Sequence, residues 1–343
     1  MRSPGIFVIR YKYSTPRNAL GFRHAPLPRR SFLHLAAVAT LSRIAQAQAW
    51  PARPIRLVVG FVAGGPNDIL ARLIAEWLMA RLGQPVVVEN NASSNAATSA
   101  VAHAAADGYT LMLIGPANAI GVTLSTNLDF DFRRDLMPVA GITREALAMV
   151  VNASVPAGDV QALSAHARAN PGTVKIAETG LGTSPQVAGE LFRIMTGIDL
   201  VPVQFVGGAV ALRALIAGDV QVMFEPMSAS IGPVRAGKLR ALAVTTAQRI
   251  TALPEVPSMV EILPGFEMSA VTGIAAPRAT PADIVERLNA EINAAYGDPA
   301  MVARFAETGG EVLTGTPAAF GKLFGGEIVQ WAKLLKLSGI KTE

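Results

Sequence analysis

The sequence predicts an α/β protein in which mainly parallel sheets are covered by helices on both faces. Short, continuous apolar runs alternate with amphipathic helical patterns along most of the chain. Glycine-bearing loops connect several of these runs to the helix that follows. Apolar residues make up 51% of the 343 residues, which is ample for the core of one or two domains.

The predicted elements follow from hydrophobic periodicity. Strands are expected at residues 55–61, 86–89, 110–114, 146–151, 174–177, 201–205, 220–224, 239–244 and 268–276. The helix after Gly65 carries Ile69, Leu73 and Trp77 on one stripe. Further helices begin near residues 159, 184 and 209.

The C-terminal part is predicted to be mainly helical. Helices are expected at 281–295, 299–308 and 317–337, each with a proline in its first turn, and a short strand at 311–313. No flexible Gly/Ser linker separates two halves of the chain. If there are two lobes, short crossing strands must join them, and the runs 146–151 and 268–276 are the best candidates.

The excess of basic over acidic residues in this chain comes from its first 49 residues. They contain 8 of the 30 basic residues and no acidic residue. Residues 50–343 therefore contain 22 basic and 25 acidic residues, a net charge of −3. The basic pI therefore says nothing about the partners of the folded protein, and aromatic residues do not interleave with a basic patch. Nucleic-acid binding is disfavoured.

Residues 1–49 look like an export signal. Arg29 and Arg30 open a twin-arginine-like R-R-x-F-L pattern, an apolar run covers residues 32–41, and the A-x-A sequence 47–49 precedes Trp50. The run is too short to span a membrane, and an ordinary Sec signal stays open as an alternative. A chain without cysteine fits an exported, soluble protein of the bacterial periplasm, and it has no thiolate metal ligands or disulfides.

The loop after the first strand predicts an anion site. Gly64 and Gly65 let a ligand approach the backbone, Pro66 suits the first helical position, and Asp68 can cap a free amide in the first turn. The remaining free amides favour a negative charge. Because lysine is absent, a nucleotide P-loop is disfavoured, and a purely structural turn remains the alternative.

Two further loops repeat this design. In the second loop Thr183 or Ser184 can cap a helix after Gly182, and in the third Gly207 and Gly208 precede a helix. Ligands of open α/β sheets bind beyond the carboxyl ends of the strands, so the three loops are expected to converge on one small anion. Asn118, just past another strand, could add a side-chain amide, although a plain turn asparagine is the simpler reading.

Catalytic motifs are missing from the sequence. His103 and His166 lie on alanine-rich helical patterns, and no G-x-S-x-G elbow, H-E-x-x-H motif or metal-ligand spacing occurs. Glu225 ends a strand and could face a cleft. An exported hydrolase would need Asp68 or Glu225 as its base, without a nucleophile–base pair. We therefore expect no enzyme activity, no cofactor and no metal.

Several segments resemble the tripartite tricarboxylate transporter substrate-binding (Bug) family. They are W-P-A-R-P-I-R-L-V-V-G-F-V-A-G-G-P-N-D, L-G-Q-P-V-V-V-E-N, D-G-Y-T-L-M-L-I-G, G-T-S-P-Q-V-A-G-E-L-F, A-G-D-V-Q-V-M-F and A-G-K-L-R-A-L-A-V-T. The resemblance runs from Trp50 nearly to Glu343, in the order of the family.

The resemblance implies a two-lobed type II periplasmic binding protein, or Venus flytrap, in which each lobe is a mainly parallel sheet flanked by helices. Lobe 1 is expected at 50–145 and 275–343, and lobe 2 at 146–274. Family members hold small carboxylates through backbone amides and hydroxyls. The positions that match the family's ligand loops are Phe61, Gly64, Gly65, Asp68, Gly182, Thr183, Ser184, Gly207, Gly208 and Glu225, the last in place of a common Asp.

The departures from the family concern the ligand. Gln186 replaces a frequent histidine, the pair 205–206 replaces Tyr-Lys, and the segment 270–272 lacks a common tryptophan. They suggest a carboxylate with fewer polar groups or with an apolar body. The expected partners are this ligand and the membrane permease of a tripartite transporter, with a sensor receptor as the alternative. The protein itself is expected to be a monomer that closes its lobes over the ligand.

Overall fold

The computed structural model describes residues 50–125 and 127–340 of the chain. The predicted export signal, residues 1–49, lies outside the described residues. Among the helices of the described ranges, none combines the length and the apolar character that a membrane crossing requires.

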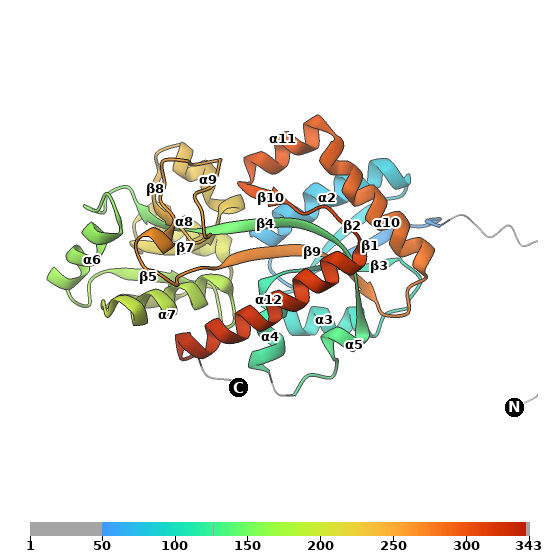
Figure 1. The fold of residues 1–343 in the computed structure, drawn as a ribbon, viewed down its shortest axis with the longest axis horizontal. Helices are drawn as coiled ribbons and strands as arrows, with labels where there is room; N and C mark the ends of the chain where they lie inside the picture. Colours follow the sequence, from blue (N-terminus) through green and yellow to red (C-terminus); the bar gives the residue numbers. More distant parts are fainter. Residues whose placement is uncertain (1–49, 126, 341–343) are drawn as a thin grey trace, which may run out of the picture. The chain divides into compact units, whose positions relative to one another are not determined.

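The strands form one curled ten-stranded sheet in the order β2-β1-β3-β9-β4-β7-β5-β6, with β8 and β10 also pairing with β4 (Figure 1). The strand bounds are β1 Ile55–Val59, β2 Val86–Asn90, β3 Thr110–Ile114, β4 Leu136–Asn152, β5 Lys175–Glu178, β6 Val201–Gln204, β7 Val222–Pro226, β8 Leu239–Val244, β9 Ser269–Pro277 and β10 Gly310–Val312. The ends differ from the predicted ones by a few residues, with β4 as the exception.

Parallel pairing is confined to two groups of strands. It joins β2, β1 and β3 at one end of the sheet and β6, β5 and β7 at the other. Between them, β9 is antiparallel to β3 and to β4, and β4 is antiparallel to β7. The connecting strands are antiparallel because β4 leads the chain from the first group to the second and β9 brings it back.

β4 begins ten residues before the predicted strand at 146–151. Its first half pairs with β9 and β10, and its last residues pair with β7 and β8, so this one strand belongs to both groups. Register shifts occur between Pro138 and Ala140 and between Gly141 and Thr143. Proline and glycine disrupt a strand pattern in sequence but are tolerated at such irregularities, which is why the prediction missed this half.

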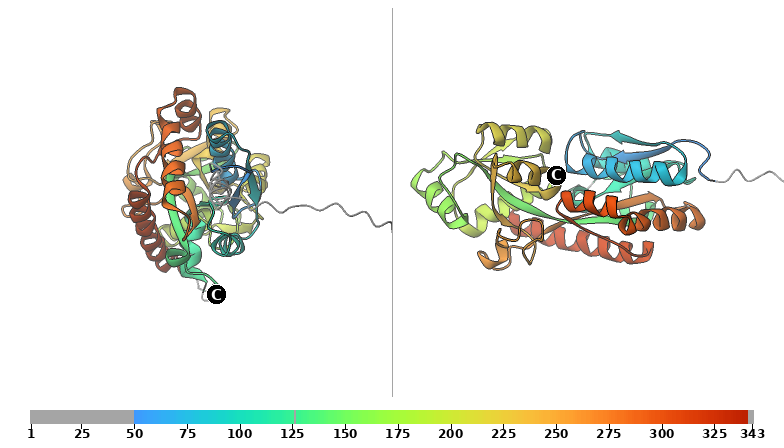
Figure 2. Two further views of the ribbon diagram at one scale, coloured as in Figure 1. Left: turned by 90° about the vertical axis from the view of Figure 1, so that its right-hand side faces the viewer. Right: turned by 90° about the horizontal axis from the view of Figure 1, so that it is seen from above.

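Helices cover the sheet on both faces (Figures 1 and 2). Their bounds are α2 Pro66–Leu82, α3 Ser94–Ala102, α4 Pro116–Leu124, α5 Phe132–Asp135, α6 Val160–Ala169, α7 Ser184–Thr196, α8 Gly208–Ala217, α9 Met227–Arg235, α10 Ala282–Ala294, α11 Pro299–Glu307 and α12 Pro317–Ser338. The three predicted C-terminal helices are present, with Pro299 and Pro317 in the first turns and Pro281 at the N-cap of α10.

Helix α12 ties the two strand groups together. It packs on α4, β4 and α7, and it buries the indole of Trp331 in the core. Burying a side chain of this size stabilises the fold by roughly 3 kcal/mol. Among the helices that follow a strand, α2, α4, α7, α8 and α9 come after β1, β3, β5, β6 and β7. The turns at these junctions build the site.

Candidate functional site

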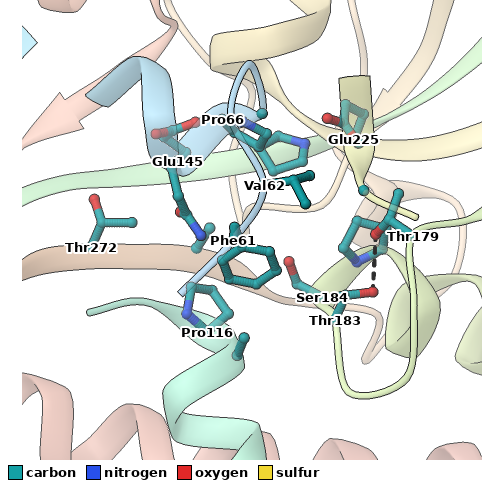
Figure 3. A pocket seen from close by; sticks show the side chains of 18 residues that line it. Phe61, Val62, Pro66, Pro116, Glu145, Thr179, Thr183, Ser184, Glu225 and Thr272 are labelled. Carbon is teal, nitrogen blue, oxygen red and sulfur yellow. Dashed lines mark hydrogen bonds between the residues drawn. The ribbon is translucent and has the colours of Figure 1, made fainter. Parts of the chain in front are cut away.

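A small cavity of about 60 Å³ lies where the turns of the two strand groups meet (Figure 3). It is lined by residues of the α2 turn (Phe61, Val62, Gly65, Pro66, Asn67), the α4 turn (Pro116, Ala117), the α7 turn (Thr179, Thr183, Ser184, Pro185), the α8 turn (Gly207, Gly208), and strands β4, β7 and β9 (Glu145, Glu225, Pro226, Ala270, Thr272). This inner cavity is therefore shared between the two strand groups.

A second hollow of about 390 Å³ continues the inner cavity outward. The two share the residues Phe61, Val62, Ala117, Thr179, Thr183 and Gly207. We call this hollow the outer chamber. Its other walls combine apolar side chains, such as Leu124 and Phe205, with polar ones, such as Ser94 and Asn95.

Three helices that begin at the inner cavity have no side-chain cap, a feature that they share with α10, which begins away from it. The N-caps of α2, α7 and α8 are Gly65, Thr183 and Gly207, and none of them accepts a hydrogen bond from a first-turn amide. Away from the cavity, α6 is capped by Asp159 and α12 by Thr316. First-turn amides need an acceptor, and the positive end of the helix dipole favours an anion. The cavity thus collects donors for a negatively charged group.

The two hydroxyls of the α7 turn have different surroundings. Thr183 Oγ1 donates to the carbonyl of Gly180 at 2.9 Å and accepts from Thr179 Oγ1 at 3.1 Å. Thr183 is the N-cap residue of α7, as expected, but its hydroxyl does not cap the helix. It bonds instead to Gly180 and Thr179 within the preceding loop. The hydroxyl of Ser184 points into the cavity (Figure 3), so Ser184 is the better placed of the two to contact a ligand.

Three of the predicted glycines allow the loops to approach one another. A Cβ on Gly207 would lie 2.4 Å from Val62 Cγ2, and one on Gly182 would lie 2.9 Å from Leu124 Cδ1. Gly64 faces the Cβ of Ala209 on α8. All three glycines have a positive φ. Neither Gly64 nor Gly182 lines the inner cavity, and Gly182 lines the outer chamber, so a role of Gly182 in ligand contact stays a prediction for that chamber.

The structure also keeps the side chains of Asp68 and Asn118 away from the cavity wall. Asp68 Oδ2 accepts hydrogen bonds from the Gly64 amide and from Arg72 Nε, both at 2.9 Å. Asn118 Oδ1 accepts from the Gly115 amide, and its Nδ2 donates to the hydroxyls of Ser94 and Thr98. Because the protein supplies these partners, both side chains stabilise turns of the site through hydrogen bonds and do not face the ligand space.

Glu225 lies at the end of β7, and its side chain is 1% exposed. Neither carboxyl oxygen has a hydrogen-bond partner among the described residues. The carboxyl group lies against the start of α8, since a Cβ on Gly208 would be 2.8 Å from Oε1. Burial, with a smaller effect from the charge of Glu145, raises the pKa of Glu225 to about 8.

Glu145, on β4, is a second buried carboxyl in the cavity and was not predicted from the sequence. Its Oε1 accepts from Thr143 Oγ1, and its Oε2 accepts from the Ser228 amide, both at 3.3 Å. Burial raises the pKa of Glu145 to about 7 despite these hydrogen bonds. A carboxylate directly before the apolar run 146–151 was the available signal, but the predicted strand began one residue after Glu145.

No lysine, arginine or histidine is among the residues that line the inner cavity. Within the ranges that the structure describes, no group of three acidic or histidine side chains could hold a metal ion. His103 is the C-cap residue of α3 and His166 lies on α6, and neither lines the cavity. Gln186, in place of the family histidine, accepts a hydrogen bond from the Gly182 amide at 2.9 Å and so supports the α7 turn.

The chain is similar to known proteins of one family. Residues 70–340 match the model of the tripartite tricarboxylate transporter family receptor. The chain is 35% identical over 310 residues to the protein BugT of Bordetella pertussis, which covers 89% of this chain and 95% of BugT.

Two solved structures from Rhodopseudomonas palustris are also similar. Rpa4515 with adipate has a TM-score of 0.81 and 35% identity, covering 85% of this chain and 99% of that one. MatC with bound malate has a TM-score of 0.77 and 30% identity, covering 83% of this chain and 100% of that one. The fold is accordingly that of a two-lobed periplasmic binding protein, and the chain belongs to the tripartite tricarboxylate transporter receptor (Bug) family of solute-binding proteins.

Proposed function

We propose that this protein is a periplasmic receptor that captures a small carboxylate in the inner cavity and presents it to a membrane permease. The observation that carries the proposal is that three helix starts without side-chain caps meet at one cavity. The helices that begin at the cavity, α2, α7 and α8, leave their first amides without a side-chain acceptor, whereas α6 and α12 are capped. A ligand carboxylate supplies the missing acceptor.

The expected affinity is consistent with a receptor. Each helix end contributes roughly 0.3–1 kcal/mol to holding an anion, and up to ~2 kcal/mol when partly buried. Three such ends, the hydroxyl of Ser184 and the ring of Phe61 together approach the ~8 kcal/mol of a micromolar complex once water is excluded. The similar structures of Rpa4515 with adipate and of MatC with bound malate contain carboxylates, which supports this ligand class.

We assign lobe 1 to residues 50–145 and 275–343 and lobe 2 to residues 146–274. Both the order of the strands and the continuity of β4 across the two groups favour this division. Ligand binding then stabilises the form in which Val62 lies against Gly207. The protein acts by binding, as a monomer, without chemical turnover, after export under the direction of residues 1–49.

A calorimetric screen against mono-, di- and tricarboxylates tests the proposal. We expect one carboxylate to bind with a stoichiometry near one and to be recovered unchanged after incubation. Conversion of the ligand into a product would instead favour an enzyme. Failure of every carboxylate to bind, with the protein folded, would remove the proposed function.

A further inference from the structure

The inner cavity contains two buried carboxyl groups whose role the capture of a plain carboxylate does not explain. Glu225 and Glu145 are each 1% exposed and line the same small space as the uncapped helix starts. Glu145 has two hydrogen-bond partners of its own, but both oxygens of Glu225 have none within the described part of the chain. A buried carboxyl without partners is costly, so its natural partner is expected to come from the ligand.

We propose that the ligand is an α-amino acid, whose carboxylate binds the free amides at the helix starts and whose ammonium group binds Glu225, with Glu145 adding a second negative charge. This inference rests on the proposed function and narrows its ligand class. The two kinds of group meet in one place, because the carboxyl of Glu225 lies against Gly208, the first residue of α8. One carbon atom separates the carboxylate and the ammonium group of an α-amino acid, which matches this close juxtaposition.

The size of the cavity agrees with that head group. A water-sized group needs about 10–15 Å³, so a space of about 60 Å³ accommodates roughly four to six of them. The α-amino-carboxylate head group has a nitrogen, two carbons and two oxygens. The amino acid's side chain then extends past Phe61 into the outer chamber of about 390 Å³, where both polar and apolar walls are available.

The charges around the site favour the same ligand. A plain dicarboxylate would place a second anionic group beside Glu225 and Glu145, which would then have to stay protonated, and no basic side chain of the described residues lines the cavity to offset its charge. The charges of a zwitterion are neutralised within the site, the anion by helix ends and the cation by carboxylates.

Titration calorimetry with matched pairs of probes tests the inference. Each pair differs only in the α-amino group: L-glutamate and glutarate, L-leucine and 4-methylpentanoate, L-asparagine and succinamate. We expect at least one amino acid to bind about tenfold or more tightly than its partner. Because the ammonium group lowers the pKa of Glu225, binding at pH 7 should release a proton, seen as a dependence of the heat on the buffer.

The variant Glu225→Gln should weaken the amino acid about tenfold or more, leave the deaminated partner unchanged or tighter, and reduce the proton release. Glu286→Gln, on the exposed face of α10, is the matched control, and a thermal melt shows that both variants fold. Tighter binding of the deaminated probes together with proton uptake would mean that a neutral Glu225 donates to a carboxylate, which overturns the inference but leaves the proposed function. Binding of no probe, and of no carboxylate in the wider screen, would overturn both.

Discussion

Asp68 and Glu225 are both buried carboxyls beside a helix start, and of the two only Asp68 accepts hydrogen bonds from other described residues. Asp68 is 4% exposed, and its Oδ2 accepts hydrogen bonds from Gly64 and Arg72 while its Oδ1 has no partner among the described residues. Glu225 is 1% exposed, and within the same ranges neither of its oxygens has a partner. Burial pushes the pKa of Asp68 upward, but these hydrogen bonds outweigh it and the pKa is lowered; for Glu225 burial prevails and the pKa rises to about 8. The α2 turn thus supplies hydrogen bonds to its own carboxylate, while the wall formed by β7 and α8 contains the carboxyl group that we propose the ligand contacts.

The prediction with the largest expected effect places a side chain in the inner cavity, between the α2 turn and Glu225. Gly65 lines the cavity, has a negative φ, and a Cβ there would meet only Val62 O, at 3.8 Å. The substitution Gly65→Val should therefore fold normally while its side chain occupies the ligand space. We expect affinity to fall about 100-fold or more, or ~2.7 kcal/mol, in calorimetry. Gly158→Val, in a loop with open space around it, is the control, and equal affinity for both variants would refute the placement of the ligand.

The second test uses the stability of the ligand-free protein. Below pH ~4.5 Glu225 is protonated in both the folded and the unfolded chain and has no effect on their difference. Between that pH and about 8 the folded protein keeps the proton while the unfolded chain releases it, so the free energy of unfolding falls as pH rises, by at most ~1.4 kcal/mol per pH unit for one group. Glu145 adds to this fall up to about pH 7.

Glu225→Gln should remove the part of this pH dependence of the free energy of unfolding that Glu225 causes. Because a buried charge is replaced by a neutral amide, the variant should be more stable than the wild type by ~2 kcal/mol at pH 8 and nearly equal to it at pH 4. Thermal or denaturant unfolding at several pH values measures the difference. A variant that is less stable at pH 8 would show that Glu225 has a partner within the protein.

Asp68→Asn should change the free energy of unfolding in the opposite direction and make the protein less stable. The depressed pKa of Asp68 means that its stabilisation is present above the unfolded pKa near 3.8 and disappears as pH falls below it. The variant should lose about 1–2 kcal/mol at neutral pH, where the bonds to the Gly64 amide and to Arg72 are charge-assisted. Its affinity for the ligand should change little, because the side chain does not line the cavity. A large loss of affinity at full stability would place Asp68 in the site.

The sequence predicted the turns of this site better than it predicted which side chains face the ligand. Phe61, Gly65, Ser184 and Gly208 were recognisable because they follow strands and precede helices, which places them at one edge of the sheet. The direction of a side chain within such a turn is decided by its neighbours. Asp68 points back at the Gly64 amide, a contact that composition and spacing do not reveal.

Glu145 was missed for a different physical reason. It lies in the middle of a 17-residue strand whose first half contains Pro138 and Gly141, and the predicted strand included only the uninterrupted apolar part. Its carboxyl reaches the cavity because β4 passes from one strand group to the other at this point. Pairing between distant strands determines that position, so local pattern alone could not assign it.

The smallest expected effects separate the two neighbouring hydroxyls of the α7 turn. Ser184→Ala should weaken the ligand about fivefold, or ~1 kcal/mol, without loss of stability, because its hydroxyl faces the cavity. Thr183→Val should instead reduce the free energy of unfolding by ~1 kcal/mol, since it removes the bonds to Gly180 and Thr179. Calorimetry and unfolding measured on both variants resolve the pair. If the two results were exchanged, the hydroxyl of Thr183 would leave its loop partners when the ligand binds, and the α7 turn would be completed only in the complex.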